Sequence, residues 1–401
     1  MKTWLTVLFC LAYLLGSAQR CGTVSVAAGS FAPVTTETPV SIYNGRDTLA
    51  DEVIVVPVVV HVLYHTKDEN ISEDQIQSQI ESLNKDFRRR NEDAENTPIP
   101  FQKFAADSRI VFCLAKVDPH GRRTGGIVRK YTKDQFWLSD DEMKFSSKGG
   151  DDAWDASKYL NIWVCNLFGR TLGYGVFPGG PPEKDGLVIQ YNVFGTRGFL
   201  KPTFNKGRTV THEIGHWLGL KHLWGDESCG DDGIFDTPTQ QTSNTFCPTF
   251  PRKSTCSPDE NGDMFMNFMD FTDDACMNMF TTGQKRVMRS QFALGRPRNS
   301  LLQSNVCDSS LATGGPLVEE TESNFHVSVY PNPFTSEIII KSDNAAITGR
   351  MLELFDITGR KFVSQKITSQ KTTIRADYLR PGVYLIKITG TRKSDIYKVV
   401  K

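Results

Sequence analysis

The sequence has few histidines, no net charge and no long apolar run. Only 7 of its 401 residues are His, and 46 Lys and Arg balance 46 Asp and Glu. This balance argues against a whole-chain nucleic-acid binder held by phosphate neutralisation. No apolar stretch reaches the ~18–20 residues that a transmembrane helix requires. With 39% hydrophobic residues, the chain is predicted to form a globular core.

Length and charge distribution predict more than one unit. At roughly 100–200 residues per domain, a chain of 401 residues corresponds to two or three units. Residues 325–401 contain 13 basic and 6 acidic residues, so the charge of the chain is uneven. A stretch rich in Ser, Gly, Thr and Glu precedes them and is typical of a linker, which we expect at residues 308–324.

The first residues are typical of an exported protein. Lys2, an apolar stretch from Trp4 to Leu15 and the small residues Gly16 to Ala18 predict a signal peptide at residues 1–18. An N-terminal core helix is the alternative. Residues 19–50 have little periodicity and are expected to form a propeptide.

Residues 51–307 carry the patterns of a mixed α+β domain. Ser72 with Gln75 matches a capping box and Ile71 with Ile76 a hydrophobic staple, which predicts a helix starting near Ser72. Strands are expected at Val53–Tyr64, Ile110–Val117, Tyr159–Cys165 and Gly186–Tyr191.

The C-terminal part, residues 325–401, shows only β patterns. Short runs alternate with turn clusters, which predicts a small all-β, Ig-like sandwich. The expected strands are His326–Tyr330, Glu337–Lys341, Met351–Phe355, Val383–Ile388 and Ile396–Val400.

One histidine-rich segment carries the chemistry. His212 and His216 are four residues apart, so on a helix both imidazoles project from one face and can bind one Zn²⁺. Glu213 can reach a zinc-bound water without ligating the metal, as a general base does. Gly219 can end the helix in a left-handed conformation and bring His222 to the same ion. Three imidazoles leave one position for water, which is the catalytic pattern.

A catalytic site with three histidine ligands explains this segment better than a chance match or another type of zinc site does. Chance H-E-x-x-H in the chain is of order ~1 in 100, and the added Gly and His lower this below ~1 in 10,000. A thermolysin-like site would take a later glutamate as third ligand, whereas Gly219 and His222 favour the three-histidine type of the metzincin peptidases. A non-catalytic surface adhesin with a structural zinc is the alternative from another class, but such a site would not need Glu213.

The sequence resembles the smaller secreted bacterial and archaeal branch of the pappalysin metzincins. The resemblance runs from about Val53 to Cys307 and includes a methionine turn at Met269. Its further motifs are Ile71–Ile76, Phe112–Ala115, Leu160–Trp163, Leu172–Gly175 and Asp270–Phe280. It implies an endopeptidase that cleaves proteins or peptides, with zinc on the three histidines, Glu213 as base and Met269 under the metal. Relatives often have tyrosine where this chain has Phe271, which cannot donate a hydrogen bond to an oxyanion.

Export makes disulfides permissible, and eight cysteines remain after the signal peptide. By resemblance, Cys229 pairs with Cys256 and Cys247 with Cys276. A structural zinc knot is the alternative, and the states of Cys113, Cys165 and Cys307 stay open.

The family precedent makes calcium plausible in the same loop-rich segment. Its candidate ligands are Asp231, Asp232 and Asp236, since hard carboxylates suit Ca²⁺. Solvated loop acids are the alternative.

Cys21 stands almost at the expected mature N-terminus. A thiolate there could occupy the water position on zinc and keep the enzyme latent, which resembles the cysteine switch of some metzincin zymogens. A lipoprotein cysteine and a disulfide partner are the alternatives, although the residues before Cys21 do not form a lipobox. Arg46 is a plausible cleavage point between leader and enzyme.

Substrate is expected to lie extended along an edge strand formed by Gly173, Tyr174 and Gly175. Members of the pappalysin family that prefer a basic P1′ residue have an acidic side chain just before the last cysteine of the Met-turn region. This chain has Ala275 there, so the resemblance argues against an arginine preference.

The C-terminal part resembles the type IX secretion sorting domain. The motifs are Val329–Phe334, Leu354–Arg360 and Leu379–Tyr384. The resemblance implies transit through the periplasm, passage across the outer membrane by the type IX machinery, and release or surface attachment. A carbohydrate- or protein-binding sandwich is the alternative.

Overall fold

The computed structural model describes residues 20–23, 52–257, 260–313, 327–342, 347–389 and 394–401. Two compact units divide the chain, a first unit of Met1–Gly314 and a second unit of Gly315–Lys401. The expected signal peptide and most of the expected propeptide, including Arg46, lie outside the described residues. Arg20 to Thr23, which belong to that propeptide, are described with the first unit.

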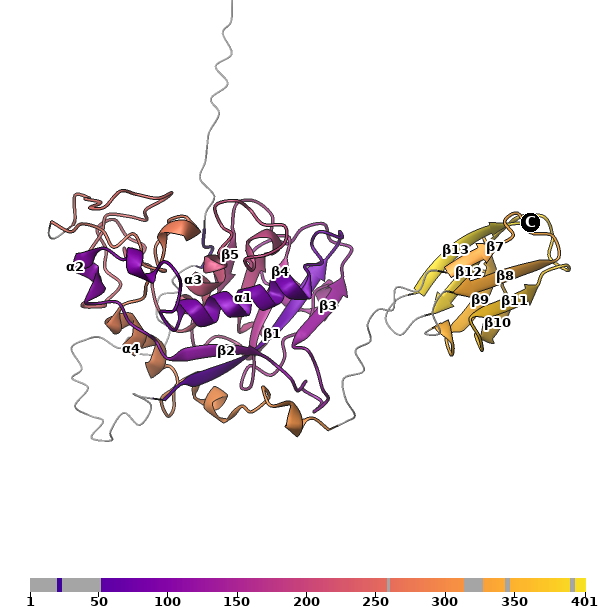
Figure 1. Cartoon of the computed structure of the whole chain (residues 1–401), viewed down its shortest axis with the longest axis horizontal. Helices are drawn as coiled ribbons and strands as arrows, with labels where there is room; N and C mark the ends of the chain where they lie inside the picture. The colour runs from indigo at the N-terminus through magenta and orange to yellow at the C-terminus, as the bar shows by residue number, and fades with distance from the viewer. Residues whose placement is uncertain (1–19, 24–51, 258–259, 314–326, 343–346, 390–393) are drawn as a thin grey trace, which may run out of the picture. The chain divides into compact units, whose positions relative to one another are not determined.

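The first unit is built on a six-stranded sheet with the order β2-β1-β4-β6-β5, in which β3 also pairs with β1 (Figure 1). Only β5 is antiparallel to its neighbour; the other pairs are parallel. The strands are β1 (Ile54–Tyr64), β2 (Ile110–Leu114), β3 (Ile127–Tyr131), β4 (Leu160–Cys165), β5 (Gly173–Gly175) and β6 (Leu187–Gln190). Strand β5 therefore forms one edge of the sheet.

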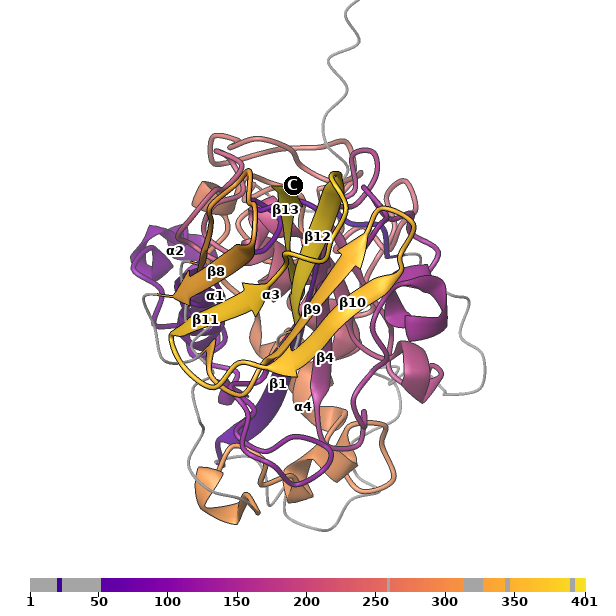
Figure 2. The ribbon, with the colours of Figure 1, turned by 90° about the vertical axis from the view of Figure 1, so that its right-hand side faces the viewer.

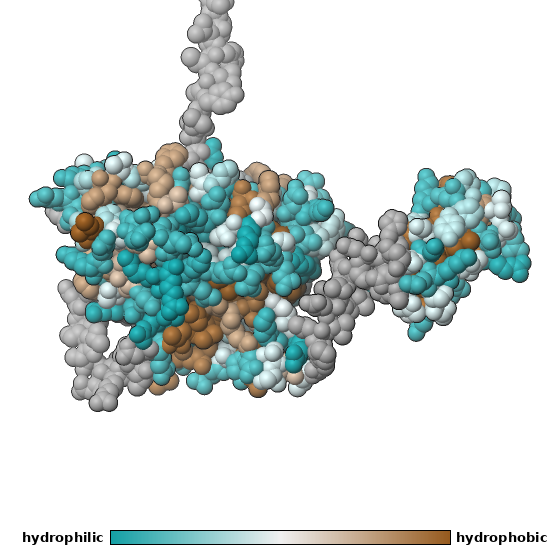
Figure 3. Space-filling model, viewed as in Figure 1, coloured by the Kyte–Doolittle hydropathy of each residue, from teal (hydrophilic) through white to brown (hydrophobic). Residues whose placement is uncertain are grey.

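Strand β1 is covered on both faces. Its residues from Val56 to Leu63 are buried, which explains why this segment is a nearly continuous apolar run instead of an alternating one. On the face seen in Figure 3, most of the surface belongs to hydrophilic residues, and hydrophobic residues gather below α1, near β1 and β2.

Two of the α-helices in the described part of the chain pack side by side on the sheet. The helices are α1 (Glu73–Asp86), α2 (Ile99–Gln102), α3 (Arg208–Trp217) and α4 (Thr282–Ser290). Helices α1 and α3 contact each other, while α1 also packs on β2 and α3 on β5 and β6. Short 3-10 turns lie at Ala94–Asn96, Glu142–Lys144, Ser146–Lys148, Pro182–Lys184, Tyr191–Val193, Asp274–Cys276, Asn299–Gln303 and Ser309–Leu311.

The predicted start of α1 is confirmed, but the capping box is only half formed. The Ser72 side chain accepts the backbone N–H of Gln75 at 3.1 Å. The Gln75 side chain does not return the bond and instead donates to the carbonyl oxygens of Phe194 and Tyr191. The predicted hydrogen bond from the Gln75 side chain to the backbone of Ser72 was therefore wrong, because the Gln75 amide bonds to a loop that is distant in the sequence.

The second unit contains two antiparallel sheets, of order β10-β9-β12-β13 and β11-β8-β7 (Figure 2). The strands are β7 (Val327–Tyr330), β8 (Glu337–Ser342), β9 (Met351–Asp356), β10 (Lys361–Lys366), β11 (Lys371–Arg375), β12 (Val383–Thr389) and β13 (Ser394–Val400). Alternate residues of β8, β9 and β12 join one buried core, as in a sandwich. The all-β prediction for this unit is confirmed.

Three disulfides lie in the first unit, among the described residues. They join Cys229 to Cys256, Cys247 to Cys276 and Cys113 to Cys307, whereas Cys21 and Cys165 are free and buried. The pair Cys113–Cys307 ties β2 to the end of this unit.

The expected linker begins later than residue 308. Ser309–Leu311 forms a 3-10 turn, and the backbone N–H of Thr313 donates to the carbonyl of Gly121 at 2.7 Å. These residues therefore belong to the first unit.

Candidate active site

Helix α3 and the turn after it bring three imidazoles together. The helix ends after Trp217, and Gly219 has φ +90°, the left-handed conformation that turns the chain back. This turn brings the Nε2 atom of His222 within 3.3 Å of that of His212 and 3.1 Å of that of His216. The Nε2 atoms of His212 and His216 are 3.1 Å apart.

A fixed acceptor holds each ring in one tautomer. The Nδ1 atom of His212 lies 2.7 Å from the Phe268 carbonyl, and that of His216 lies 2.8 Å from the Leu220 carbonyl. A carbonyl can only accept, so these Nδ1 atoms carry the proton and leave the Nε2 lone pairs facing the centre. For His222 the partner is the Asp226 carboxylate, at 2.5 Å.

Glu213 points toward the same centre. Its Oε2 lies 2.9 Å from Thr23 Oγ1 and 3.4 Å from Cys21 Sγ, and within the described part of the chain its Oε1 has no hydrogen-bond partner. Burial raises the pKa of this carboxyl to about 7, although hydrogen bonds from Cys21 and Thr23 oppose the shift. An incompletely bonded, buried carboxylate is poised to accept another donor, such as water.

The Cys21 thiol is the fourth group at this centre. Its Sγ and one nitrogen of each of His212, His216 and His222 all lie within 4.8 Å of one another. Among the described residues, no other group of three or more His, Cys, Asp or Glu side chains is placed close enough to share a metal ion. This donor set suits zinc, which takes four nitrogen or sulfur ligands.

Burial keeps the rings of His212 and His216 neutral. It lowers the pKa of His212 and of His216 well below the usual value, and the neighbouring histidines lower it further. Burial also raises the pKa of the Cys21 thiol, as does the adjacent Glu213 carboxylate. A divalent cation would reverse the effect on Cys21, since a metal stabilises the thiolate.

The segment carrying Cys21 lies along β5. Cys21 forms a parallel bridge with Gly173, and the N–H of Gly22 donates to the Gly173 carbonyl at 2.9 Å. The N–H of Gly175 donates to Thr23 Oγ1, also at 2.9 Å. The leader therefore adds to the strand that we expected to bind substrate.

Met269 packs directly against the helix of the site. A Cβ atom at Gly215 would lie only 2.3 Å from Met269 Sδ, so this close approach requires glycine in the middle of the motif. Phe271 lies nearby, with its ring centroid 5.6 Å from His212 and 4.9 Å from His222. Trp224 stacks on His222 at 4.6 Å.

The three acidic residues considered for calcium do not converge as a group of side chains. Asp236 accepts from Thr281 Oγ1 and from the N–H of Gly283, at the start of α4. Asp231 accepts from the N–H of Gly233. Asp232 differs, because its Oδ2 is buried without a partner among the described residues, and burial raises its pKa to about 7.

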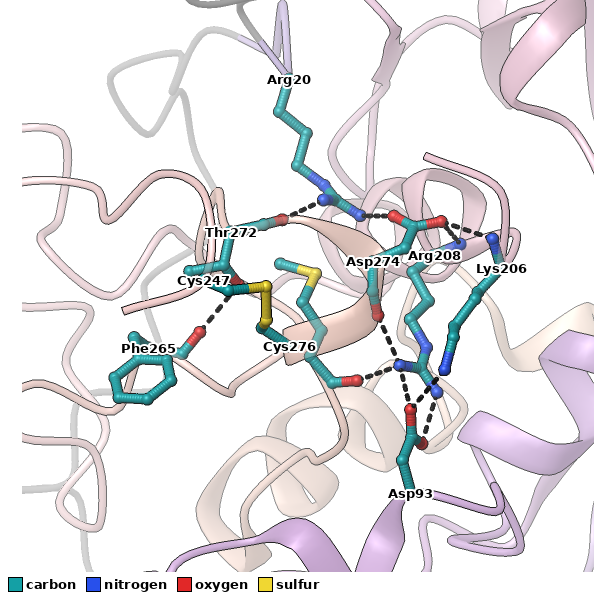
Figure 4. Close-up of a disulfide and its surroundings, with 10 residues drawn as sticks. Arg20, Asp93, Lys206, Arg208, Cys247, Phe265, Thr272, Asp274 and Cys276 are labelled. Carbon is teal, nitrogen blue, oxygen red and sulfur yellow. Dashed lines mark hydrogen bonds and ion pairs between the residues drawn. A yellow bond between two sulfur atoms is a disulfide. The ribbon is translucent and has the colours of Figure 1, made fainter. Parts of the chain in front are cut away.

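Sequence reasoning missed Asp226 and the contacts of Arg20. Asp226 lies four residues after His222, a spacing that could have drawn attention to it. The Arg20 guanidinium donates to Asp274 Oδ1 at 2.7 Å and to the Thr272 carbonyl, beside the disulfide Cys247–Cys276 (Figure 4). No local pattern signals this contact, because the two segments are 254 residues apart.

Comparison with known proteins decides the family. Residues 145–293 match the M43 peptidase model described as pregnancy-associated plasma protein-A, and residues 328–401 match the model of the secretion system C-terminal sorting domain. An extracellular metalloprotease of Verticillium alfalfae is 32% identical over 258 residues, which cover 62% of this chain and 80% of the relative. The chain belongs to the M43 (pappalysin) family of metallopeptidases.

Solved structures agree with this assignment. Mature mirolysin of Tannerella forsythia, in complex with a cleaved peptide, is 46% identical, with a TM-score of 0.63 over 66% of this chain and 99% of that chain. Promirolysin of the same organism is 47% identical, with a TM-score of 0.62 over 64% and 86%. The metzincin-type α+β fold of the first unit is thereby confirmed.

This M43 peptidase is a secreted or cell-surface zinc metalloendopeptidase with a type IX sorting domain. Family membership favours this function over that of a non-catalytic adhesin. Among the helices that the structure describes, none has the length and hydropathy of a transmembrane segment.

Proposed function

We propose that the chain is made as a latent zymogen in which His212, His216 and His222 bind the catalytic zinc and Cys21 takes the fourth position. The observation that carries the proposal is the convergence of these four ligand atoms within 4.8 Å. The likeness to promirolysin, a proenzyme by its name, supports a latent form. Release of the residues around Cys21 would expose the position that water needs.

Glu213 acts as the general base. Zinc held by the three imidazoles supplies the Lewis acidity that activates water and polarises a peptide carbonyl. When Cys21 and Thr23 leave, both oxygens of Glu213 become available to water. The carboxylate accepts the proton of the attacking water and passes it to the leaving amine.

Strand β5 binds the substrate backbone. The contacts that Gly173 and Gly175 make with the leader are main-chain contacts, of the kind that an extended peptide makes when it adds to a sheet edge. The leader thus occupies the place of a substrate.

The domain limits follow the same scheme. Residues 1–18 form the signal peptide, 19–50 the propeptide and 51–307 the catalytic domain. Residues 308–313 pack on the catalytic domain, and the linker follows them. Residues 325–401 direct passage through the type IX machinery. We also propose that Asp232 binds a calcium ion, because its buried Oδ2 lacks a partner in the described structure.

Peptide release from a denatured protein mixture tests the function. We expect the processed enzyme to release peptides, and we expect chelated enzyme and a Glu213→Ala variant to release none. Unchanged cleavage by the variant, or purified protein without stoichiometric zinc, would refute the proposal.

A further inference from the structure

A buried ion pair joins two distant segments at the end of helix α3. Asp185 lies shortly before β6, and Arg298 lies after α4, 113 residues further along the chain. Their side chains are only 9% and 3% exposed. Both oxygens of Asp185 accept from the guanidinium, Oδ1 from Nη2 at 2.9 Å and Oδ2 from Nη1. Burial of two charges is costly, so stability alone does not account for this pair.

Trp217, the last residue of α3, contacts both members of the pair. Its indole Nε1 donates to Asp185 Oδ1 at 3.0 Å, and the Cζ atom of Arg298 lies 4.0 Å from the centroid of its ring. The Trp217 carbonyl accepts from Nε and Nη2 of Arg298, at 3.3 and 3.2 Å. The last carbonyls of a helix lack partners within the helix, and a cation there also matches the helix dipole. Arg298 therefore caps α3, while Asp185 fixes the side chain of its last residue.

The capped residue lies between two of the histidines that we propose as zinc ligands. His216 directly precedes it, and His222 follows it by five residues, across the turn at Gly219. The segment after α4 also reaches this turn. A Cβ atom at Gly219 would lie 3.0 Å from Gln291 Nε2, and the Arg298 N–H donates to the Gln291 carbonyl at 2.9 Å. The backbone that connects the two imidazoles is therefore held by this segment.

The orientation of the rings depends on the same backbone. The Leu220 carbonyl, which accepts from His216 Nδ1 at 2.8 Å, belongs to the turn. A shift of the helix end would move His222 relative to His216 and would also release the His216 ring from its acceptor. Groups that orient a metal ligand in this way affect metal affinity nearly as strongly as the ligands do.

We propose that Arg298 and Asp185 are positioning residues, which hold the end of α3 so that His216 and His222 meet the zinc in one fixed geometry. The proposal rests on the proposed function, since it takes these histidines as zinc ligands. An ion pair with directed hydrogen bonds specifies one arrangement, whereas apolar residues of similar volume would pack at lower cost and define the helix end less well.

Zinc titration of the full chain tests the role of Arg298. Arg298→Met should raise the Kd for zinc, measured by competition with a chromophoric chelator, at least about tenfold. Arg298→Lys, which keeps the charge and loses the planar fork, should recover only part of the affinity. Arg289→Met is the matched control, because Arg289 is also buried but donates to backbone carbonyls just before β1 and β2. An unchanged Kd in Arg298→Met, or an equal increase in the control, would overturn the inference.

A double variant separates positioning from stability. Arg298→Met alone leaves the buried Asp185 carboxylate without its bidentate partner, which lowers the stability of the fold. Asp185→Leu combined with Arg298→Met removes both charges and should recover stability, measured by urea unfolding of the metal-free chain. The Kd for zinc should nevertheless stay at least about tenfold above that of wild type, because neither polar group of Trp217 is held. Wild-type zinc affinity in the double variant would overturn the inference.

Cobalt reports the geometry of the site directly. The visible spectrum of the full chain loaded with Co²⁺ depends on how the ligands are arranged. We expect this spectrum to change in Arg298→Met and to keep its wild-type form in Arg289→Met. Identical spectra of Arg298→Met and wild type would overturn the inference. A wild-type chain that binds neither zinc nor cobalt would refute the proposed function, and this inference with it.

Discussion

The hydroxyl oxygen of Thr23 lies 2.9 Å from Glu213 Oε2 and accepts the N–H of Gly175 at the same distance. One side chain of the leader thereby joins the catalytic helix to the edge strand β5. The latency that we propose would therefore depend on more than the Cys21 thiol, and the first prediction tests the contribution of that thiol.

Cys21→Ala in the full chain should shorten the lag before activity, because the ligand that fills the fourth position is lost. Cleavage of a fluorogenic peptide, followed from the moment of purification, measures the lag. Cys165→Ala is the matched control, since Cys165 is the other free, buried cysteine of the described residues. An identical lag in Cys21→Ala and wild type would count against the switch.

Glu213→Gln should reduce kcat by about 10²–10⁴, the usual contribution of a general base. The zinc content should stay at one ion per chain, because Glu213 is not a ligand. Metal analysis beside the kinetics distinguishes the two roles. Loss of zinc in this variant would show that the carboxylate holds the metal.

Gly215→Ala should destabilise the first unit by about 1–3 kcal/mol, as overpacking does. The added methyl group would lie 2.3 Å from Met269 Sδ, which must then move away from the helix. Urea unfolding measures the change. Gly125→Ala, where a Cβ meets nothing within 4 Å, is the control and should have a much smaller effect.

Asp93→Asn should cost stability at neutral pH and little at pH 2. Burial opposes ionisation of Asp93, but the hydrogen bonds and charge of Arg208 prevail and lower its pKa to about 2. Because the folded value is below the unfolded value of about 3.8, the contribution is complete above pH 4 and is lost as the pH falls through 2. After allowance for solvent screening we expect about 1–2 kcal/mol. Unfolding of both proteins from pH 7 to pH 2 measures the difference, and a difference independent of pH would contradict this account.

Calcium should raise the melting temperature of the full chain, and Asp232→Asn should reduce the increase. The physical reason is that a cation compensates the Oδ2 of Asp232, which has no hydrogen-bond partner among the described residues. Scanning calorimetry with EGTA and with added Ca²⁺ provides the measurement. An equal response of Asp232→Asn and wild type would place any calcium elsewhere.

Local patterns made much of the site predictable. Four-residue spacing places His212 and His216 on one face, and Gly219 returns the chain to bring His222 beside them. The apolar run of β1 and the helix start at Ser72 could also be predicted, since each depends on neighbouring residues. Strand β3 escaped prediction because most of its residues are half-exposed and it lacks a clear alternation.

Contacts between distant segments could not be predicted in the same way. The Gln75 amide donates to the Phe194 carbonyl and not to the expected capping box, and the Arg20 guanidinium donates to Asp274. In both cases the partner is chosen by tertiary packing, so nothing in the surrounding sequence signals it. Helix α4 is different, because Thr281 and Gln284 form a complete capping box that is visible in the sequence and was overlooked.

The bond between Cys113 and Cys307 closes residues 113–307 of the first unit into a covalent loop with a sequence separation of 194. Any cut beyond Cys307 lies outside that loop and leaves both of its ends tied together. If a cut removes the sorting domain, the new C-terminal end of the peptidase therefore stays tied to β2. Release from a surface would not expose an end from which the domain could unfold.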